Sequence, residues 1–237
     1  MKKIVAGLLL ITVAFAAAAQ STIINDANAE IRNITAFTGI SVSGAIDIYL
    51  TQGNEDAIAV SANDAKYRDR IKAEVKGGTL TIWYDNEGMR WSGGNKKLKA
   101  YISFKSINQL KATGASDVFI NGTLKASDLD LKLTGASDLK GILDIGTLVA
   151  NISGASDMTV SGKIDMLKVA ASGASDLKDY GLVVQTCEAN ASGASDIKIT
   201  VEKELTADAT GASDIVIRGN GVIKKMTKSG ASSVRKS

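Results

Sequence analysis

The 237-residue chain contains no histidine, no proline and a single cysteine, Cys187. Without histidine, the Ser-His-Asp triad, the Cys-His pair and every histidine-ligated zinc or iron site are excluded. One cysteine cannot form a disulfide within the chain or build a cysteine-rich metal site. Aromatic residues make up only 5%, which is few for stacking on nucleic acid bases. The 23 glycines are left as the chief turn formers, and this suits a repetitive β-structure.

The first nineteen residues have the anatomy of a secretory signal peptide. Lys2 and Lys3 precede an apolar stretch over residues 4–15, and Ala16–Ala19 supplies the small residues of a cleavage site. We predict cleavage between Ala19 and Gln20, without a lipoprotein anchor because no cysteine follows. Residues 20–237 then hold 26 basic and 25 acidic residues, with no long basic run and no further long apolar stretch. The sequence therefore predicts an exported protein that neither spans a membrane nor binds nucleic acid.

A repeated tetrapeptide dominates the rest of the chain. Gly-Ala-Ser-Asp begins at six positions spaced by 18 to 21 residues, and a seventh copy reads Gly-Ala-Ser-Ser. A degenerate early copy covers residues 43–47. The glycines that open the seven copies are Gly114, Gly135, Gly154, Gly173, Gly193, Gly211 and Gly230. A period near 19 is typical of a solenoid, in which each unit buries its apolar face against its neighbours.

Apolar residues alternate with polar ones on both sides of each tetrapeptide, as expected for strands with one buried face. Positions 4 and 2 residues before the glycine and 4 after it are mostly apolar, and we expect them to point inward. The residues 4 after the glycine are Val118, Leu139, Met158, Leu177, Ile197, Ile215 and Val234. On the same parity Gly and Ser point inward, whereas Ala, Asp and the preceding Ser or Thr point outward. Cys187 is predicted to be a buried small residue, and Lys224 and Lys228 occupy inward positions of an atypical last coil.

Together these patterns predict an all-β fold, a parallel β-solenoid with about 19 residues and two or three short strands per coil. Ankyrin and tetratricopeptide units are too long for this period, and the consensus of leucine-rich repeats is missing. Residues 107–237 form the repeat region. Residues 20–106 form an N-terminal β region with a first coil around Gly44, a hairpin turning at Gly77-Gly78 and a strand over 98–104. We expect the two regions to form one continuous domain.

The order of these segments resembles the head GIN domain family of bacterial auto-transporter adhesins. The resemblance rests on Ser-Gly-Ala-Ile-Asp-Ile in the first coil, on the Gly-Gly-Thr-Leu-Thr-Ile hairpin and on the serial Gly-Ala-Ser-Asp coils, and it extends from about Ile34 to Val234. It implies a right-handed parallel β-helix in the periplasm or on the outer surface of a Gram-negative bacterium. It supplies no catalytic residues.

Stacked coils align the aspartates of the repeat about 4.8 Å apart, where adjacent charges repel by about 0.9 kcal/mol in bulk water. The aligned residues are Asp117, Asp138, Asp157, Asp176, Asp196 and Asp214. Three kinds of partner could offset the repulsion. Backbone N–H groups at the corner are the first, neighbouring lysines the second, and a divalent cation such as calcium the third. Local hydrogen bonding is the interpretation that we favour, and no cofactor is required.

Three functions are compatible with this sequence. The first is a non-enzymatic surface or envelope module, an adhesin that binds a glycan or a protein and that can oligomerise through its sheet edges. The second is a periplasmic structural or ligand-binding protein, with Trp91 in the polar loop over residues 85–95 as the candidate sugar contact. The third is a carbohydrate-active β-helix enzyme. We disfavour the enzyme because its carboxylates would be one residue type copied on every coil rather than a mixed local site.

Overall fold

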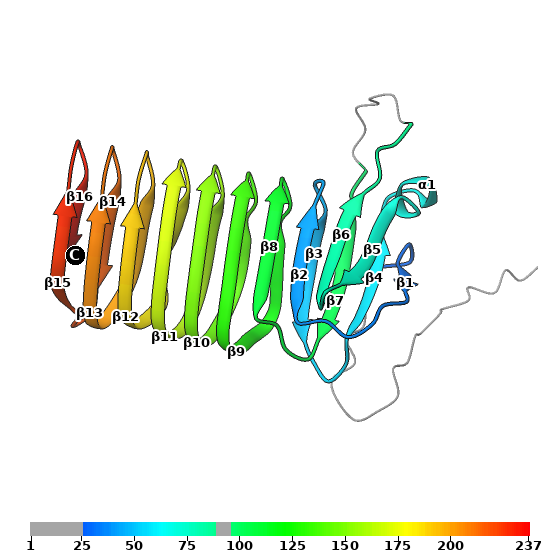
Figure 1. Ribbon diagram of the computed structural model, residues 1–237, viewed down its shortest axis with the longest axis horizontal. Helices are drawn as coiled ribbons and strands as arrows, with labels where there is room; N and C mark the ends of the chain where they lie inside the picture. Colours follow the sequence, from blue (N-terminus) through cyan, green and yellow to red (C-terminus); the bar gives the residue numbers. More distant parts are fainter. Residues whose placement is uncertain (1–25, 89–95) are drawn as a thin grey trace, which may run out of the picture.

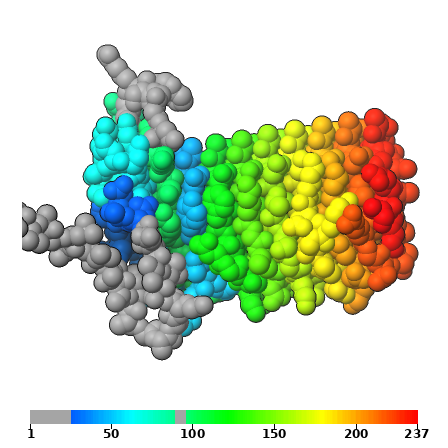
Figure 2. All heavy atoms as spheres, turned by 180° about the vertical axis from the view of Figure 1, so that it is seen from behind, coloured from blue at the N-terminus to red at the C-terminus, as the bar shows by residue number. Residues whose placement is uncertain are grey.

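The computed structural model describes residues 26–88 and 96–237 as a rod of stacked coils (Figure 1). The predicted signal peptide and Trp91 lie outside the described residues. Viewed from behind, the coils of the repeat region form bands across the rod in sequence order, from green to red (Figure 2). Within the described residues, no helix is long and apolar enough to cross a membrane.

The repeat region is a parallel β-solenoid, as predicted, but each middle coil is one long strand of 14 to 18 residues rather than two or three short ones. The chain enters it through β8 (Gln109–Gly114) and then winds through β9 (Val118–Gly135), β10 (Leu139–Gly154), β11 (Asp157–Gly173), β12 (Asp176–Ala191) and β13 (Asp196–Ala209). Each of these strands pairs in parallel with the next coil. The last coil consists of β14 (Asp214–Arg218), β15 (Val222–Lys228) and β16 (Ser233–Lys236).

The interior of the solenoid is filled by the residues that the alternation predicts. Val118, Leu139, Met158, Leu177, Ile197 and Ile215 are at most 1% exposed and stack in register from coil to coil. Cys187 lies in the same core and is a free thiol. Burial raises the pKa of this thiol to about 12, so Cys187 acts as a small buried residue, as predicted.

The Gly-Ala-Ser-Asp tetrapeptides form a corner, which lies along the upper edge of the rod in Figure 1. The prediction that the glycine points inward is wrong, because each corner glycine is exposed and has a positive φ of 76° to 90°. The turn at the glycine interrupts the alternation, and the alanine is exposed as predicted. A Cβ on Gly173 would lie 2.6 Å from the carbonyl oxygen of Gly154, so the corners stack backbone on backbone.

The serines of the tetrapeptides point inward, as predicted, and several of them hydrogen-bond along the stack. Six of them are fully buried: Ser116, Ser137, Ser156, Ser175, Ser195 and Ser213. The Ser156 hydroxyl accepts a hydrogen bond from the backbone N–H of Ser137 at 3.1 Å, and the Ser137 hydroxyl accepts one from Ser116 at 3.3 Å. The corners from the first coil to Ser175 are therefore each tied to the next one through a buried serine hydroxyl.

The N-terminal region contains the predicted first coil, β2 (Gly39–Ser43) and β3 (Asp47–Gln52), with Ile40, Val42, Ile46, Ile48 and Leu50 buried. The predicted hairpin is β5 (Ile71–Lys76) and β6 (Thr79–Tyr84), and the predicted strand is β7 (Lys99–Phe104). The sequence analysis missed β1 (Glu30–Arg32), β4 (Ala57–Ser61) and the short helix α1 (Ala65–Arg68). β4 pairs antiparallel to β7, and β1 pairs antiparallel to β4, so the parallel stack ends on this side in antiparallel strands.

One prediction about the last coil is corrected. Lys224 does not occupy an inward position, because a β-bulge lies between Ile223 and Lys225 and places Ile223 opposite Leu205. Lys224 instead forms an ion pair with Glu204 at 3.3 Å. Lys228 does align with the buried Ala209, yet it is exposed, because the last coil has no further coil to cover it within the described residues.

Candidate functional site

The repeat aspartates form one column on the outside of the solenoid, which we call the aspartate column. The strand register pairs Asp157 with Asp176, Asp176 with Asp196, and Asp196 with Asp214. Asp117 and Asp138 continue the column toward the first coil, where Asp47 follows. The column ends at Lys99, which pairs with Asp47, and at Ser233, which pairs with Asp214. A cationic side chain and a neutral one therefore lie at its two ends.

Backbone N–H groups of the next coil are one partner of these carboxylates. The Asp138 carboxylate accepts a hydrogen bond from the N–H of Asp157 at 3.3 Å, and the Asp176 carboxylate accepts one from the N–H of Asp196 at 3.0 Å. At the end of the column the Ser233 hydroxyl donates to Asp214 at 2.7 Å. These contacts are the local hydrogen bonds that the sequence analysis favoured.

Lysines two residues after the aspartates are the second partner. Lys178 lies 2.5 Å from the Asp176 carboxylate and 3.4 Å from that of Asp196, and Lys198 lies 3.2 Å from Asp196. Lys140 contacts Asp138 at 3.9 Å. Lysines therefore flank the aspartate column at Asp138, Asp176 and Asp196, so the outer face of this sheet carries charges of both signs.

The pKa shifts follow the distribution of the lysines. Burial and the neighbouring Asp176 and Asp138 raise the pKa of Asp157, which has no lysine two residues later. Burial acts in the same direction on Asp196, but hydrogen bonds and charge from Lys198 and Lys178 outweigh it and lower the pKa of Asp196. Repulsion along the column is therefore relieved at Asp196 and remains at Asp157.

Opposite effects on stability follow for these two aspartates. At pH 7 we expect Asp157→Asn to raise the free energy of unfolding by a few tenths of a kcal/mol, because the ionised carboxylate is disfavoured in the folded state. Asp196→Asn should lower it by a similar amount, because the ion pairs are lost. The ionised Asp157 destabilises the fold above the ordinary carboxyl range, and the ionised Asp196 stabilises it there. At acid pH both carboxyl groups are protonated and neutral, as asparagine is, so both differences should disappear near pH 2. Urea unfolding at pH 7 and pH 2 measures this, and effects of the same sign at pH 7 would contradict it.

A cation on the aspartate column stays a prediction. Among residues 26–88 and 96–237, no group of three or more Asp, Glu or Cys side chains is arranged to hold a metal ion. Because backbone and lysine partners already serve several of the carboxylates, we expect the melting temperature to be the same in millimolar calcium and in excess chelator. A calcium-dependent rise of several degrees would show instead that the column binds cations.

Three aromatic rings lie next to the first aspartates, and the sequence analysis did not single them out. Tyr101, Tyr49 and Phe119 stack across β7, β3 and β9 with ring centroids 5.2 Å and 5.1 Å apart. The Tyr101 hydroxyl donates to Asp26 at 2.9 Å, and burial together with this hydrogen bond raises the pKa of Tyr101. Tyr49 and Phe119 each follow an aspartate of the column by two residues. This shared position in the repeat could have predicted that the two rings lie side by side.

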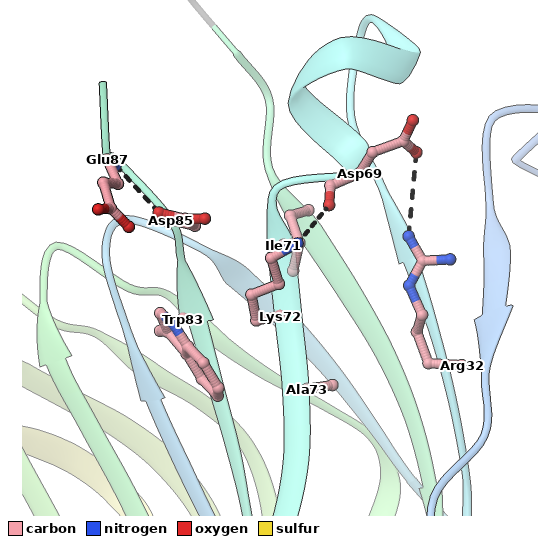
Figure 3. A pocket seen from close by; sticks show the side chains of 8 residues that line it. All are labelled: Arg32, Asp69, Ile71, Lys72, Ala73, Trp83, Asp85 and Glu87. Carbon is pink, nitrogen blue, oxygen red and sulfur yellow. Dashed lines mark hydrogen bonds and ion pairs between the residues drawn. The ribbon is translucent and has the colours of Figure 1, made fainter. Parts of the chain in front are cut away.

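A surface cleft of about 610 Å³ lies on the hairpin (Figure 3). Trp83 of β6 and Lys72 of β5 are cross-strand neighbours there. Arg32 lies 4.0 Å from the Asp69 carboxylate, and Lys72 donates to the Asp69 carbonyl at 3.1 Å. The lining thus combines one indole ring with groups of both charges, although much of this charge is already paired.

The fold and its repeated outer face define a parallel β-solenoid with a column of aspartates on its surface. A family model described as "Putative auto-transporter adhesin, head GIN domain" matches residues 36–221. The chain belongs to this family.

Crystal structures of other bacterial proteins share the fold. A "putative adhesin" from Bacteroides fragilis superposes with a TM-score of 0.79 at 22% identity and covers 88% of this chain and 96% of its own. A "putative adhesin" from Parabacteroides distasonis has a TM-score of 0.71 at 18% identity, covering 88% and 96%. A "putative lipid binding protein" from the same species has a TM-score of 0.65 at 19% identity, and the match covers 90% of this chain and 98% of its own. No curated protein matches this chain.

Proposed function

We propose that this protein is a non-enzymatic interaction module of the cell envelope or cell surface, an adhesin that binds through the outer face of its solenoid. The supporting observation is the aspartate column, which places one carboxylate on each successive coil, with lysines beside Asp138, Asp176 and Asp196. Such a face suits a partner that is itself repetitive, such as a glycan chain or an extended protein. Membership in an adhesin family is consistent with this role.

The arrangement of the carboxylates argues against the enzymatic alternative. Glycosidases need two carboxylates with different roles, and these roles come from different environments. Here the aspartates occupy equivalent positions, and hydrogen bonds to the next coil and ion pairs to Lys178 and Lys198 engage several of them. A flat activity profile on a polysaccharide panel is the expected result.

Protease treatment of intact cells tests the location. We expect the protein to be digested on intact cells, with lysed cells as the positive control and a periplasmic protein as the integrity control. Protection until lysis would place it in the periplasm. In that case the second candidate, a periplasmic ligand-binding protein that uses the cleft around Trp83, would take precedence.

Binding of the purified protein to arrays of glycans and matrix proteins tests the face itself. The informative variant is Lys140→Gln/Lys198→Gln, which removes two cations beside the aspartate column. The matched control is Lys111→Gln/Lys132→Gln, which makes the same change in charge on exposed residues of the strands that precede the corner. A ligand whose binding falls equally in both variants would not be using this face.

A further inference from the structure

The last coil of the solenoid differs in charge from the rest of the protein. Residues 215–237 contain six lysines and arginines and no aspartate or glutamate. Residues 20–214 contain 20 basic and 25 acidic residues. A slightly acidic rod therefore ends in a strongly basic coil, the red end in Figure 2. The six cationic residues are Arg218, Lys224, Lys225, Lys228, Arg235 and Lys236.

The same coil exposes large apolar side chains. Val222 is 59% exposed and Met226 is 47% exposed, the two highest values among the large apolar residues described as exposed. Met226 aligns with Ala207, which is 1% exposed, so the apolar column of the core reaches solvent at Met226. Within the described residues, β15 pairs only with β13 and β16 only with β14, and their other edges are uncovered.

The geometry points to the last coil as a binding surface for anionic lipid headgroups, with the lysines contacting phosphates and with Val222 and Met226 entering the interface between headgroups and acyl chains. Cations beside exposed apolar side chains are the combination that binds an anionic bilayer surface. Lysines on a free strand edge also prevent pairing between sheets, but that role does not require Val222 and Met226 to be exposed. The last coil of a second copy is disfavoured as the partner, because the two basic coils would repel each other.

This inference does not use the aspartate column and stands independently of the proposed function. Binding to a lipid surface differs from binding to a soluble polyanion. A soluble polyanion would contact the lysines, but its affinity would not depend on the apolar side chains. The two are distinguished by separate substitution of the cations and of the apolar residues. Both sets are exposed, so neither change should disturb the fold.

Flotation of the purified protein with vesicles tests the proposal. We expect binding to vesicles of phosphatidylcholine with 30% phosphatidylglycerol, in excess of binding to phosphatidylcholine alone. Lys225→Gln/Lys228→Gln should weaken binding about 30-fold, because each lysine near an anionic surface contributes roughly fivefold. Val222→Ser/Met226→Ser should weaken vesicle binding too, while leaving binding to soluble dextran sulfate unchanged. The control Lys111→Gln/Lys132→Gln should bind as the unmodified protein does.

Two results would overturn the proposal. The first is no preference of the unmodified protein for the anionic vesicles. The second is binding to dextran sulfate and to vesicles that depends on the lysines alone, which would make the last coil a general polyanion site. Oligomers of the lysine variant, with no vesicle binding by the unmodified protein, would show that the lysines only protect the edge.

Discussion

Gly173→Ala is expected to lower the free energy of unfolding by about 3 kcal/mol or more. Two costs combine at this corner. Gly173 has a φ of +82°, which an L-residue adopts at a cost of about 1–2 kcal/mol. The new Cβ would also lie 2.6 Å from the Gly154 carbonyl oxygen, which accepts a hydrogen bond from Ala174 at 2.8 Å and is therefore not free to move. Urea unfolding at pH 7, followed by circular dichroism, measures the loss.

Gly114→Ala is the matched control, because it separates the two costs. Gly114 has a similar φ of +89°, but the nearest atom to its added Cβ is the backbone nitrogen of Gly44, at 3.5 Å. The free energy of unfolding of this variant should therefore fall only by the cost of the positive φ, about 1–2 kcal/mol. If the two variants lose the same stability, close stacking of the corners is not what requires glycine at this position.

The strands and buried residues of the coils could be predicted because the same sequence pattern occurs seven times. One alternation of Leu139 or Met158 with polar neighbours is a weak indication of a strand, but its recurrence at a fixed spacing defines both the register and the buried face. The alternation of apolar and polar residues could not predict whether the corner glycines face inward or outward. Glycine has no side chain, and its positive φ interrupts the alternation. The bulge at Lys224 was missed because it shifts the register by one residue within a single coil.

The N-terminal elements were harder to predict because they occur once. β4 is buried at four of its five positions, so it shows no alternation, and α1 has only four residues. For the candidate site, the alignment of the aspartates followed from the period, whereas their partners did not. The contact of Lys178 with both Asp176 and Asp196 depends on the parallel pairing of adjacent coils, which brings residues twenty positions apart together.

Ser156→Ala is expected to lower the free energy of unfolding by about 1–3 kcal/mol, although it removes a single oxygen. The Ser156 hydroxyl accepts a hydrogen bond from the N–H of Ser137, and both residues are fully buried. Alanine offers no acceptor and the site is closed to solvent, so the Ser137 N–H would be left without a partner. A buried N–H group in that state costs its full desolvation. The midpoint of urea unfolding, compared at equal slope, gives the size of the effect.

Ser153→Ala, three residues earlier in the same coil, is the control. Its side chain is half-buried on the outside of the strand, where water can replace any lost contact, so we expect a change within about 0.5 kcal/mol. Suppose that the two variants lose comparable stability. The buried serine would then help to fill the corner rather than form a hydrogen bond between coils. A large loss at Ser156 alone would show that the buried serine connects adjacent coils by accepting a hydrogen bond from a backbone N–H of the neighbouring corner.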